Sequence, residues 1–356
     1  MSAINKPRPK QAAPWKQSSV GTKAAIAVAS ILPTVLAFAV GTLLHLPGLI
    51  TLVGVLLPLQ LLSAALVGSY VSGRHGRQEA LLMVLVVFFS AIVVILLGSV
   101  LWSVISSGFK VLSFSFLFQN NNYITPSTEL GYGGLGHALL GSIELVLISS
   151  AVTVPLGILV GVYLTETRDK SRTLVRTFVQ SLAGLPSVVA GLFIYSMFVV
   201  TGILRPAGIL GSLALIPLML PTVARVVEES LKLVPQDLRS AAIGLGASKF
   251  KAFMQVTLPA AKSGIITAVL LGVARILGET APILLTTLMG SGTNLNVFKD
   301  AFATLPTYLF SNLANSTAVS FSRAWGTALV MMIFVGAAFV SIRIISRNKT
   351  TAKKKR

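Results

Sequence analysis

Eight apolar segments, each long enough to cross a lipid bilayer, dominate the 356-residue sequence. A transmembrane helix needs about 20 consecutive apolar residues, and polar or charged connections separate these segments. Unpaired backbone polar groups are too costly in lipid, and a helix pairs them within one segment. The pattern therefore predicts an all-α membrane protein, a polytopic bundle of about eight transmembrane helices. The segments cover residues 22–44, 49–71, 80–106, 137–164, 176–200, 207–226, 264–288 and 323–344.

The placement of charge predicts how these helices are oriented. Charged residues make up only 11% of the chain, against about 25% in soluble domains. Of the 29 Lys and Arg residues, 24 lie in the two tails, in alternate connections or in the segment ends next to them. The positive-inside rule then predicts that both termini are cytoplasmic. The opposite side carries only Lys110, Arg205, Lys299 and Arg323.

The net charge of +19 resembles that of a nucleic-acid-binding protein. Because the basic residues cluster between apolar segments, we expect no nucleic acid and assign the charge to topology. Residues 1–21 are predicted to be a disordered basic cytoplasmic tail, and residues 346–356 a second basic cytoplasmic tail. The bilayer itself is the partner that this composition implies.

Several kinds of chemistry are missing from the sequence. The chain has no cysteine, and its three histidines lie far apart without metal-ligand spacing. No Gly-x-x-x-x-Gly-Lys-[Ser/Thr] phosphate-binding loop occurs, and no nucleophile and base are paired. We therefore expect a chain that is not an enzyme, with no metal site and no cofactor of its own.

Two charges fall within the seventh apolar segment. Arg275 and Glu279 are four residues apart, so one helix face can hold both, yet such a pair contributes only a few tenths of a kcal/mol in water. A charge at mid-bilayer costs about 2.5–3.5 kcal/mol. Gly278 and Pro282 interrupt the same helix, an arrangement that transporters use at the membrane midplane. Two interpretations remain: an ion pair that holds helices together, or an anion path in which the guanidinium meets an oxyanion.

A second interruption is predicted in the fifth segment. Pro186 follows Gly184 and precedes Gly191, so the helix is expected to break there. Ser187 then has two possible roles. Its hydroxyl can bind substrate, or it can satisfy a carbonyl that the proline leaves free.

The connection at residues 227–262 is predicted to form two short helices around Gly246. Asp237 is suited to cap the first helix, Gly246 to end it, and the second helix is expected to end near Pro259. The small residues on one surface of this elbow allow close approach of another protein. An ordinary amphipathic loop is the alternative.

This elbow resembles the signature loop of ABC-importer permeases. In that family Glu-Ala-Ala is followed by three residues, Gly, nine residues, Ile, any residue and Leu-Pro. Here Ser240 replaces the Glu and Val256 the Ile, and the spacing is otherwise the same. The resemblance implies a coupling helix that docks on an ATPase subunit. The residues so implicated are Ser240, Ala241, Ala242, Gly246, Leu258 and Pro259.

The run Ala-Arg-x-x-Gly-Glu-Thr-Ala-Pro, at 274–282, is similar to a motif of the phosphate-specific permeases. Its Glu-Thr-Ala-Pro ending resembles the PstA branch more than its partner branch PstC. The resemblance covers about residues 80–345 as a six-helix core and makes residues 22–79 an additional N-terminal hairpin. Glu144 departs from the family and has two possible settings, paired with Arg275 or facing the wet end of the bundle. The implied substrate pathway comprises Arg275, Gly278, Glu279, Thr280, Pro282 and Ser187.

The resemblance implies a permease subunit of an ATP-driven phosphate importer in a bacterial inner membrane. Its implied partners are a PstC-like second permease, an extracytoplasmic phosphate-binding protein and two ATPase subunits, which hold ATP and Mg. One alternative is an ABC permease for another oxyanion, such as molybdate, sulfate or phosphonate. A secondary transporter that needs no ATPase is the alternative from a different class.

Overall fold

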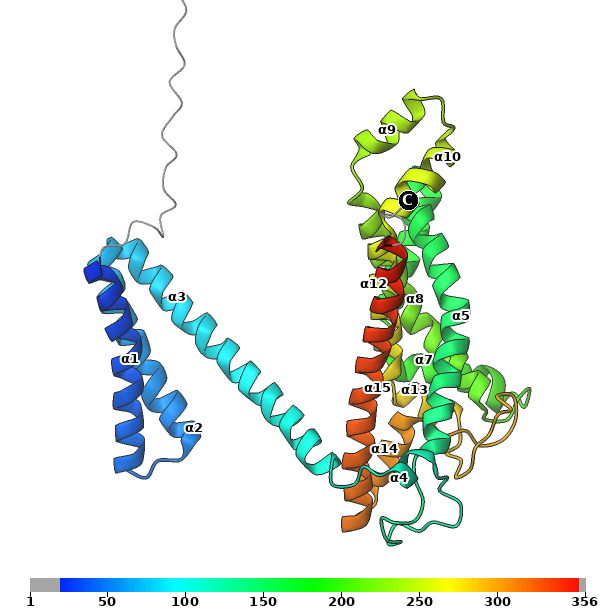
Figure 1. Cartoon of the computed structure of the whole chain (residues 1–356), viewed down its shortest axis with the longest axis horizontal. Coiled ribbons are helices and arrows are strands. Elements are labelled where there is room, and N and C mark those ends of the chain that lie inside the picture. The colour runs from blue at the N-terminus through cyan, green and yellow to red at the C-terminus, as the bar shows by residue number, and fades with distance from the viewer. Residues whose placement is uncertain (1–19, 352–356) are drawn as a thin grey trace, which may run out of the picture. The chain divides into compact units, whose positions relative to one another are not determined.

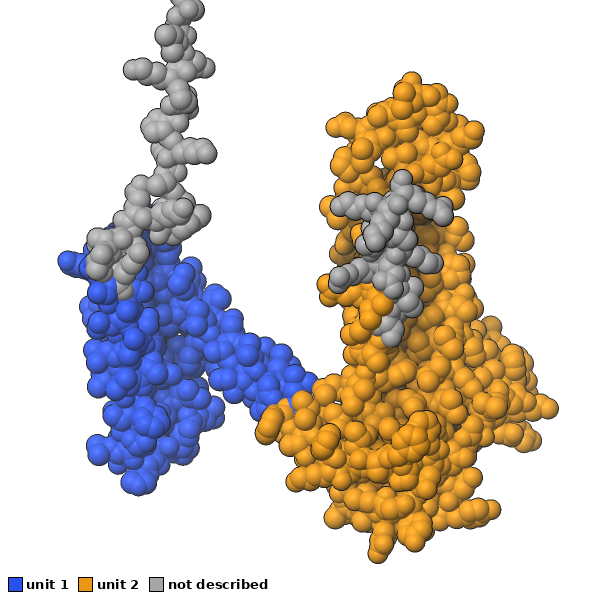
Figure 2. Space-filling view, in the orientation of Figure 1, with its two compact units in different colours: residues 1–101 blue, residues 102–356 orange. Residues whose placement is uncertain are grey.

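The computed structural model describes residues 20–351, which form helices joined by irregular segments, without any β-strand in that range. The predicted all-α fold is confirmed. The tails predicted at residues 1–21 and 346–356 lie wholly or partly outside the described residues. The chain divides into two compact units, one up to Leu101 and one from Trp102 onward (Figure 2), each described by itself. This division does not test the predicted boundary at residue 80.

The first unit is built from a helical hairpin and the helix that follows it. Gln60 Nε2 donates to the carbonyl oxygen of Ser30 at 2.8 Å, and the Ser63 hydroxyl donates to that of Ala29 at 2.5 Å. Such polar contacts join helices that gain little from apolar contact in lipid. The helices of this unit are α1 (Val20–Leu43), α2 (Gly48–Ile50), the π-helix η2 (Thr51–Leu56) and most of α3 (Leu57–Gly108).

Helix α3 is two helices joined at a sharp break. Ser72 and Gly73 leave helical geometry, and Gly73 has φ +62°, a conformation that favours glycine. The helical stretch Gly48–Gly108 has 61 residues, which as one straight helix would be about 90 Å long. That is about three times the hydrocarbon thickness. The break therefore separates two membrane spans, as the sequence predicts.

The second unit is a bundle in which α5, α8, α12 and α15 run side by side (Figure 1). One end of this bundle carries α9 and α10, and the other carries α4; we call them the α9 end and the α4 end. The elements are α4 (Phe114–Phe118), α5 (Gly136–Glu166), α6 (Lys170–Ala183), α7 (Ser187–Ile194), η3 (Tyr195–Val200), α8 (Gly208–Lys232), α9 (Gln236–Gly244), α10 (Lys249–Ala252), η4 (Phe253–Thr257), α11 (Leu258–Ala260), α12 (Lys262–Leu277), α13 (Ala281–Thr286), α14 (Leu305–Ala314) and α15 (Ala318–Thr351).

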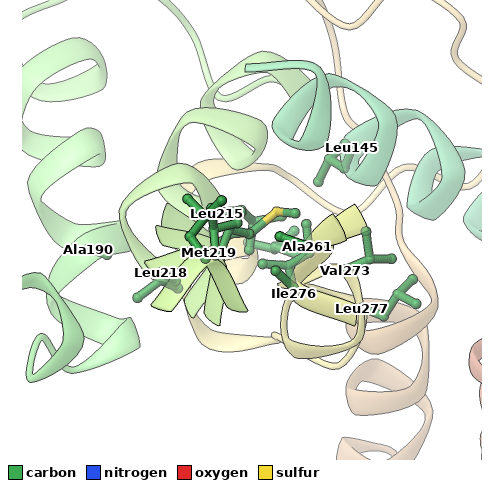
Figure 3. Close-up of a cluster of buried hydrophobic side chains, with 14 of the residues drawn as sticks. Leu145, Ala190, Leu215, Leu218, Met219, Ala261, Val273, Ile276 and Leu277 are labelled. Carbon is green, nitrogen blue, oxygen red and sulfur yellow. The ribbon is translucent and has the colours of Figure 1, made fainter. Parts of the chain in front are cut away.

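The core of the second unit lies where α5, α7, α8 and α12 meet. Figure 3 shows Leu215 and Met219 of α8 in this cluster, with Ala190 of α7 on one side of them and Ile276 of α12 on the other. Helices α5 and α8 approach closely because α5 presents glycine: a Cβ on Gly161 would lie 2.6 Å from a Val227 methyl group. Small residues at helix contacts are typical of membrane bundles.

Within residues 20–351, five helices are long and apolar enough to cross a membrane, and two bent helix pairs raise that number to seven. Counting the broken stretch Gly48–Gly108 as two spans gives the predicted total of about eight. The chain is thus a multi-pass membrane protein.

The fifth span differs from the predicted range 176–200. Its first part belongs to α6, a basic amphipathic helix, and the axis turns by 100° between α6 and the segment Ser187–Val200. Pro186 precedes α7 and disfavours helical geometry at the residue before it. The 14 residues that remain are about 21 Å long. The predicted range begins too early because residues 176–183 include the apolar face of α6, which continues the apolar sequence of the span.

The segment 289–322 is not an ordinary loop. It contains α14, which a capping box starts: the Thr304 and Thr307 side chains accept from each other's backbone N–H. Its first two residues, Leu305 and Pro306, are buried. The helix has only ten residues, and the irregular residues 290–303 separate it from the apolar segment before it. No 20-residue apolar run therefore contains it.

Arg323 is the largest polar side chain in the interior, with 2% of its surface exposed. Its Nη2 donates to the carbonyl oxygens of Thr128 and Tyr132, both at 2.9 Å, and Nη1 donates to that of Thr125 at 3.3 Å. One guanidinium thus holds the polar segment after α4 against α15. From the sequence, Arg323 was expected only to be a charge on the opposite side of the membrane from the termini.

Candidate functional site

The predicted interruption of the seventh span is present between α12 and α13. Helix α12 ends at Leu277, Gly278 has φ −97° and ψ 0°, and α13 begins at Ala281. Pro282 occupies the first turn of α13, where its missing N–H costs no hydrogen bond. The continuous helix that would place residues 275 and 279 on one face therefore stops between them.

Arg275 forms no ion pair with any described residue, so the interpretation as a pair with Glu279 or Glu144 is not supported by the geometry. The break at Gly278 carries Glu279 off the helix face of Arg275. Arg275 is exposed on the surface of this chain, while Glu279 and Thr280 are half-buried. A guanidinium without an ion-pair partner among residues 20–351 thus lies at the end of a helix expected to be in the membrane.

The two interrupted spans meet. Gly191 of α7 lies against Pro282 of α13, so closely that a Cβ on Gly191 would be 2.5 Å from the Pro282 Cα. Ser187 begins α7 one turn earlier. Its hydroxyl donates no hydrogen bond to a carbonyl of the described residues. The fold therefore brings the helix that starts at Ser187 beside the 274–282 motif.

We predict that Gly191→Ala disturbs this junction. The new methyl group meets backbone rather than a movable side chain, so overpacking is expected to cost about 1–3 kcal/mol of stability. Thermal unfolding of the purified chain in detergent measures the loss. The matched control is Gly184→Ala, whose methyl group has its nearest neighbour at 3.6 Å. Equal unfolding temperatures for the two variants would contradict the close contact.

The elbow at 227–262 forms as predicted in outline. Helix α9 ends at Gly244, and Gly246 has φ +91°, which explains the glycine at this turn. Asp237 lies in the first turn of α9, while Pro235 takes the capping position, so the predicted aspartate cap is wrong. The returning helix runs through Leu258 and Pro259 and ends at Ala260, one residue beyond the predicted stop.

Apolar side chains are exposed at the tip of this elbow. Leu245 is 90% exposed and Phe250 is 71% exposed, and Ile243 and Met254 are also exposed beside them. Ser240 and Ala241 are exposed and Ala242 is half-buried on α9. An apolar patch on a polar loop is typical of a protein interface. The elbow lies beyond the ends of the bundle helices (Figure 1).

The two groups of predicted residues are separate. Arg275 lies near the far end of α12, whose 16 residues span about 24 Å from the elbow. The structure joins the 274–282 motif to α7 and leaves the elbow at the α9 end.

Ion pairs at the α9 end are a feature that the sequence did not predict. Glu166 accepts from Arg239, and the buried carboxylate of Glu228 binds both Arg176 and Lys232. Residues 166 and 239 are 73 positions apart, so only the fold brings them together. One signal in the sequence was Glu166, a carboxylate at the last residue of α5. The helix dipole disfavours a negative charge there, which indicates that a cation elsewhere compensates it.

Comparison with known proteins adds the family. A sequence profile described as "Binding-protein-dependent transport system inner membrane component" matches residues 153–350, more than half of the chain. The chain belongs to this family.

Two curated relatives of the chain are named as phosphate permeases. The chain is 37% identical over 269 residues to "Phosphate transport system permease protein PstA 1" of Mycobacterium tuberculosis (strain CDC 1551 / Oshkosh), covering 74% of this chain and 88% of the relative. It is 36% identical over 252 residues to PstA of Haemophilus influenzae, covering 70% and 87%. The resemblance to PstA-type permeases is thereby confirmed.

Among solved structures, the permease is similar to a chain titled "Crystal structure of an amino acid ABC transporter with histidines". The two share 18% identity at a TM-score of 0.48, over 59% of this chain and 92% of the other.

Proposed function

We propose that this chain is a transmembrane permease subunit of an ATP-driven importer for inorganic phosphate, where it forms half of the translocation pathway. The observation that carries the proposal is the free guanidinium of Arg275 beside two interrupted spans, in a chain 37% identical to a named phosphate permease. Phosphate carries one to two negative charges near neutral pH and needs compensation to cross hydrocarbon.

The pathway assignment rests on Arg275, with Gly278, Glu279, Thr280, Pro282 and Ser187 around the two breaks. A guanidinium offers a planar fork of donors that suits a tetrahedral oxyanion. Interrupted helices expose backbone groups in the middle of a membrane without contact with lipid. Exposure of Arg275 on this chain is consistent with a pathway that a second, PstC-like permease completes.

The coupling assignment rests on the elbow. The exposed Leu245 and Phe250 flank Gly246, so a partner can bury apolar surface there while the glycine permits close approach. We infer two ATPase subunits as those partners, with ATP and Mg bound on them, and an extracytoplasmic phosphate-binding protein at the α4 end. ATP-driven closure of the ATPases would move the elbow and switch the bundle between its two openings.

The proposed location is a bacterial inner membrane with both termini in the cytoplasm. The elbow and the end of α15 lie at the same end of the second unit (Figure 1), and Arg176 of the basic helix α6 pairs there with Glu228 near the end of α8. Gathering of positive charge at one end supports a cytoplasmic α9 end.

Transport in reconstituted vesicles tests the function. We expect phosphate accumulation only when the permease pair, ATPase subunits, binding protein and ATP are all present. Uptake without the ATPase would instead support a secondary transporter. Competition by sulfate, molybdate or phosphonate at equal concentration would support the permease for another oxyanion.

A further inference from the structure

The elbow is attached to the bundle unequally along its two arms. The returning arm, η4 and α11, inserts Phe253 into the main core, and Ala261, the residue after α11, lies in the same core. Helix α9, the outgoing arm, has no buried residue, and it packs on α10 and η4 of its own elbow. Its attachment to the membrane helices therefore needs a different explanation.

That attachment is a bidentate ion pair. Arg239 Nη1 donates to Glu166 Oε1 at 2.8 Å, and Nη2 donates to Oε2 at 2.5 Å. Parallel bonds between guanidinium and carboxylate fix orientation as well as distance. Both side chains are partly shielded, 30% exposed for Arg239 and 25% for Glu166. Within the described part of the chain, this is the ion pair that α9 makes.

Both charges are unfavourably placed for their own helices. Glu166 is the last residue of α5, where the helix dipole favours cations, and Arg239 lies near the start of α9, where it favours anions. Each charge is compensated only when the two helices meet. Consistent with this, the hydrogen bond to Glu166 raises the pKa of the Arg239 guanidinium.

Helix α5 extends from this pair to the other end of the bundle. Its 31 residues span about 46 Å. At the α4 end, the Ser142 hydroxyl accepts from the backbone N–H of Leu305 at 2.8 Å, and Gly141 lies under the carbonyl of Ala303. A displacement of the start of α9 thus has a continuous, packed route to α14.

We propose that the Glu166–Arg239 pair is the positioning link that transmits movement of the coupling elbow to α5. This proposal rests on the proposed function, because the ATPase subunits are what would move the elbow. The returning arm moves α12 through apolar packing, and the ion pair moves α5, so both helices respond together.

Charge reversal tests the link in the assembled importer. Arg239→Glu or Glu166→Arg alone is expected to lower phosphate imported per ATP hydrolysed at least tenfold, while ATP hydrolysis persists. The double swap, Arg239→Glu with Glu166→Arg, is expected to restore that ratio to within about threefold. The matched control is Arg225→Glu, which breaks the exposed Arg225–Glu229 pair at the same end without touching α9. It should keep the wild-type ratio.

A second measurement separates the link from transport. The chain has no cysteine, so a spin label at Gln236→Cys reports the mobility of α9 in the purified chain alone. Each single reversal should increase that mobility, and the swap should restore it. Unchanged mobility or an unchanged import ratio in the single variants overturns the link, as does a swap that restores mobility without the ratio. Failure of wild-type phosphate import would refute the proposed function instead, and the label still tests the pair.

Discussion

Arg275→Ala is expected to reduce phosphate uptake about tenfold to a hundredfold while leaving the fold intact. A hydrogen bond to a charged group contributes about 1.5–3 kcal/mol, and each 1.4 kcal/mol is tenfold in an equilibrium. Because Arg275 has no ion-pair partner among the described residues, its loss leaves no carboxylate unpaired in this chain. Uptake into vesicles containing the complete importer measures the effect, and thermal unfolding in detergent should be unchanged.

Two companion variants sharpen this test. Arg275→Lys keeps the charge and loses the planar fork, so intermediate uptake is expected. Arg205→Ala removes an exposed guanidinium elsewhere and should transport normally. Wild-type uptake by a well-expressed Arg275→Ala variant would contradict the anion path. If Arg275→Ala and Glu279→Gln lower the unfolding temperature by the same amount, the result would instead favour an ion pair between Arg275 and Glu279.

Gly246→Trp is expected to uncouple the permease from its ATPase and reduce uptake to background. Apart from the two neighbouring residues, no atom of the described chain lies within 4 Å of a Cβ at Gly246, so a side chain added there starts in open space. An indole ring would occupy the surface between Leu245 and Phe250 where a partner is proposed to bind. Co-purification of the ATPase subunits with the permease measures docking, and vesicle uptake measures coupling.

Backbone strain is the competing cause and has its own control. Gly246 has φ +91°, so any L side chain there costs about 1–3 kcal/mol. Gly246→Ala carries this strain without the bulk, and it should retain most docking. If tryptophan and alanine variants lose docking equally, strain explains the effect. If the tryptophan variant docks and transports normally, the elbow is not the docking surface.

Much of the membrane architecture could be predicted because each span satisfies its own backbone. The break at Gly278–Thr280 was also readable, since glycine and proline act on the residues next to them. The range of the fifth span was not, because the apolar face of α6 resembles the apolar surface of a spanning helix over a few residues. Helix α14 was missed since its ten residues are held by packing.

The sequence by itself determined the properties that act over one helical turn or one span: membrane residence, the number of spans, the two interruptions and the elbow at Gly246. Only the tertiary structure decided which distant groups meet, namely Gly191 with Pro282, Arg323 with the segment after α4, and Glu166 with Arg239. The physical reason is range. Hydropathy and backbone preferences act between neighbours in sequence, whereas an ion pair across 73 positions exists only after the helices have packed.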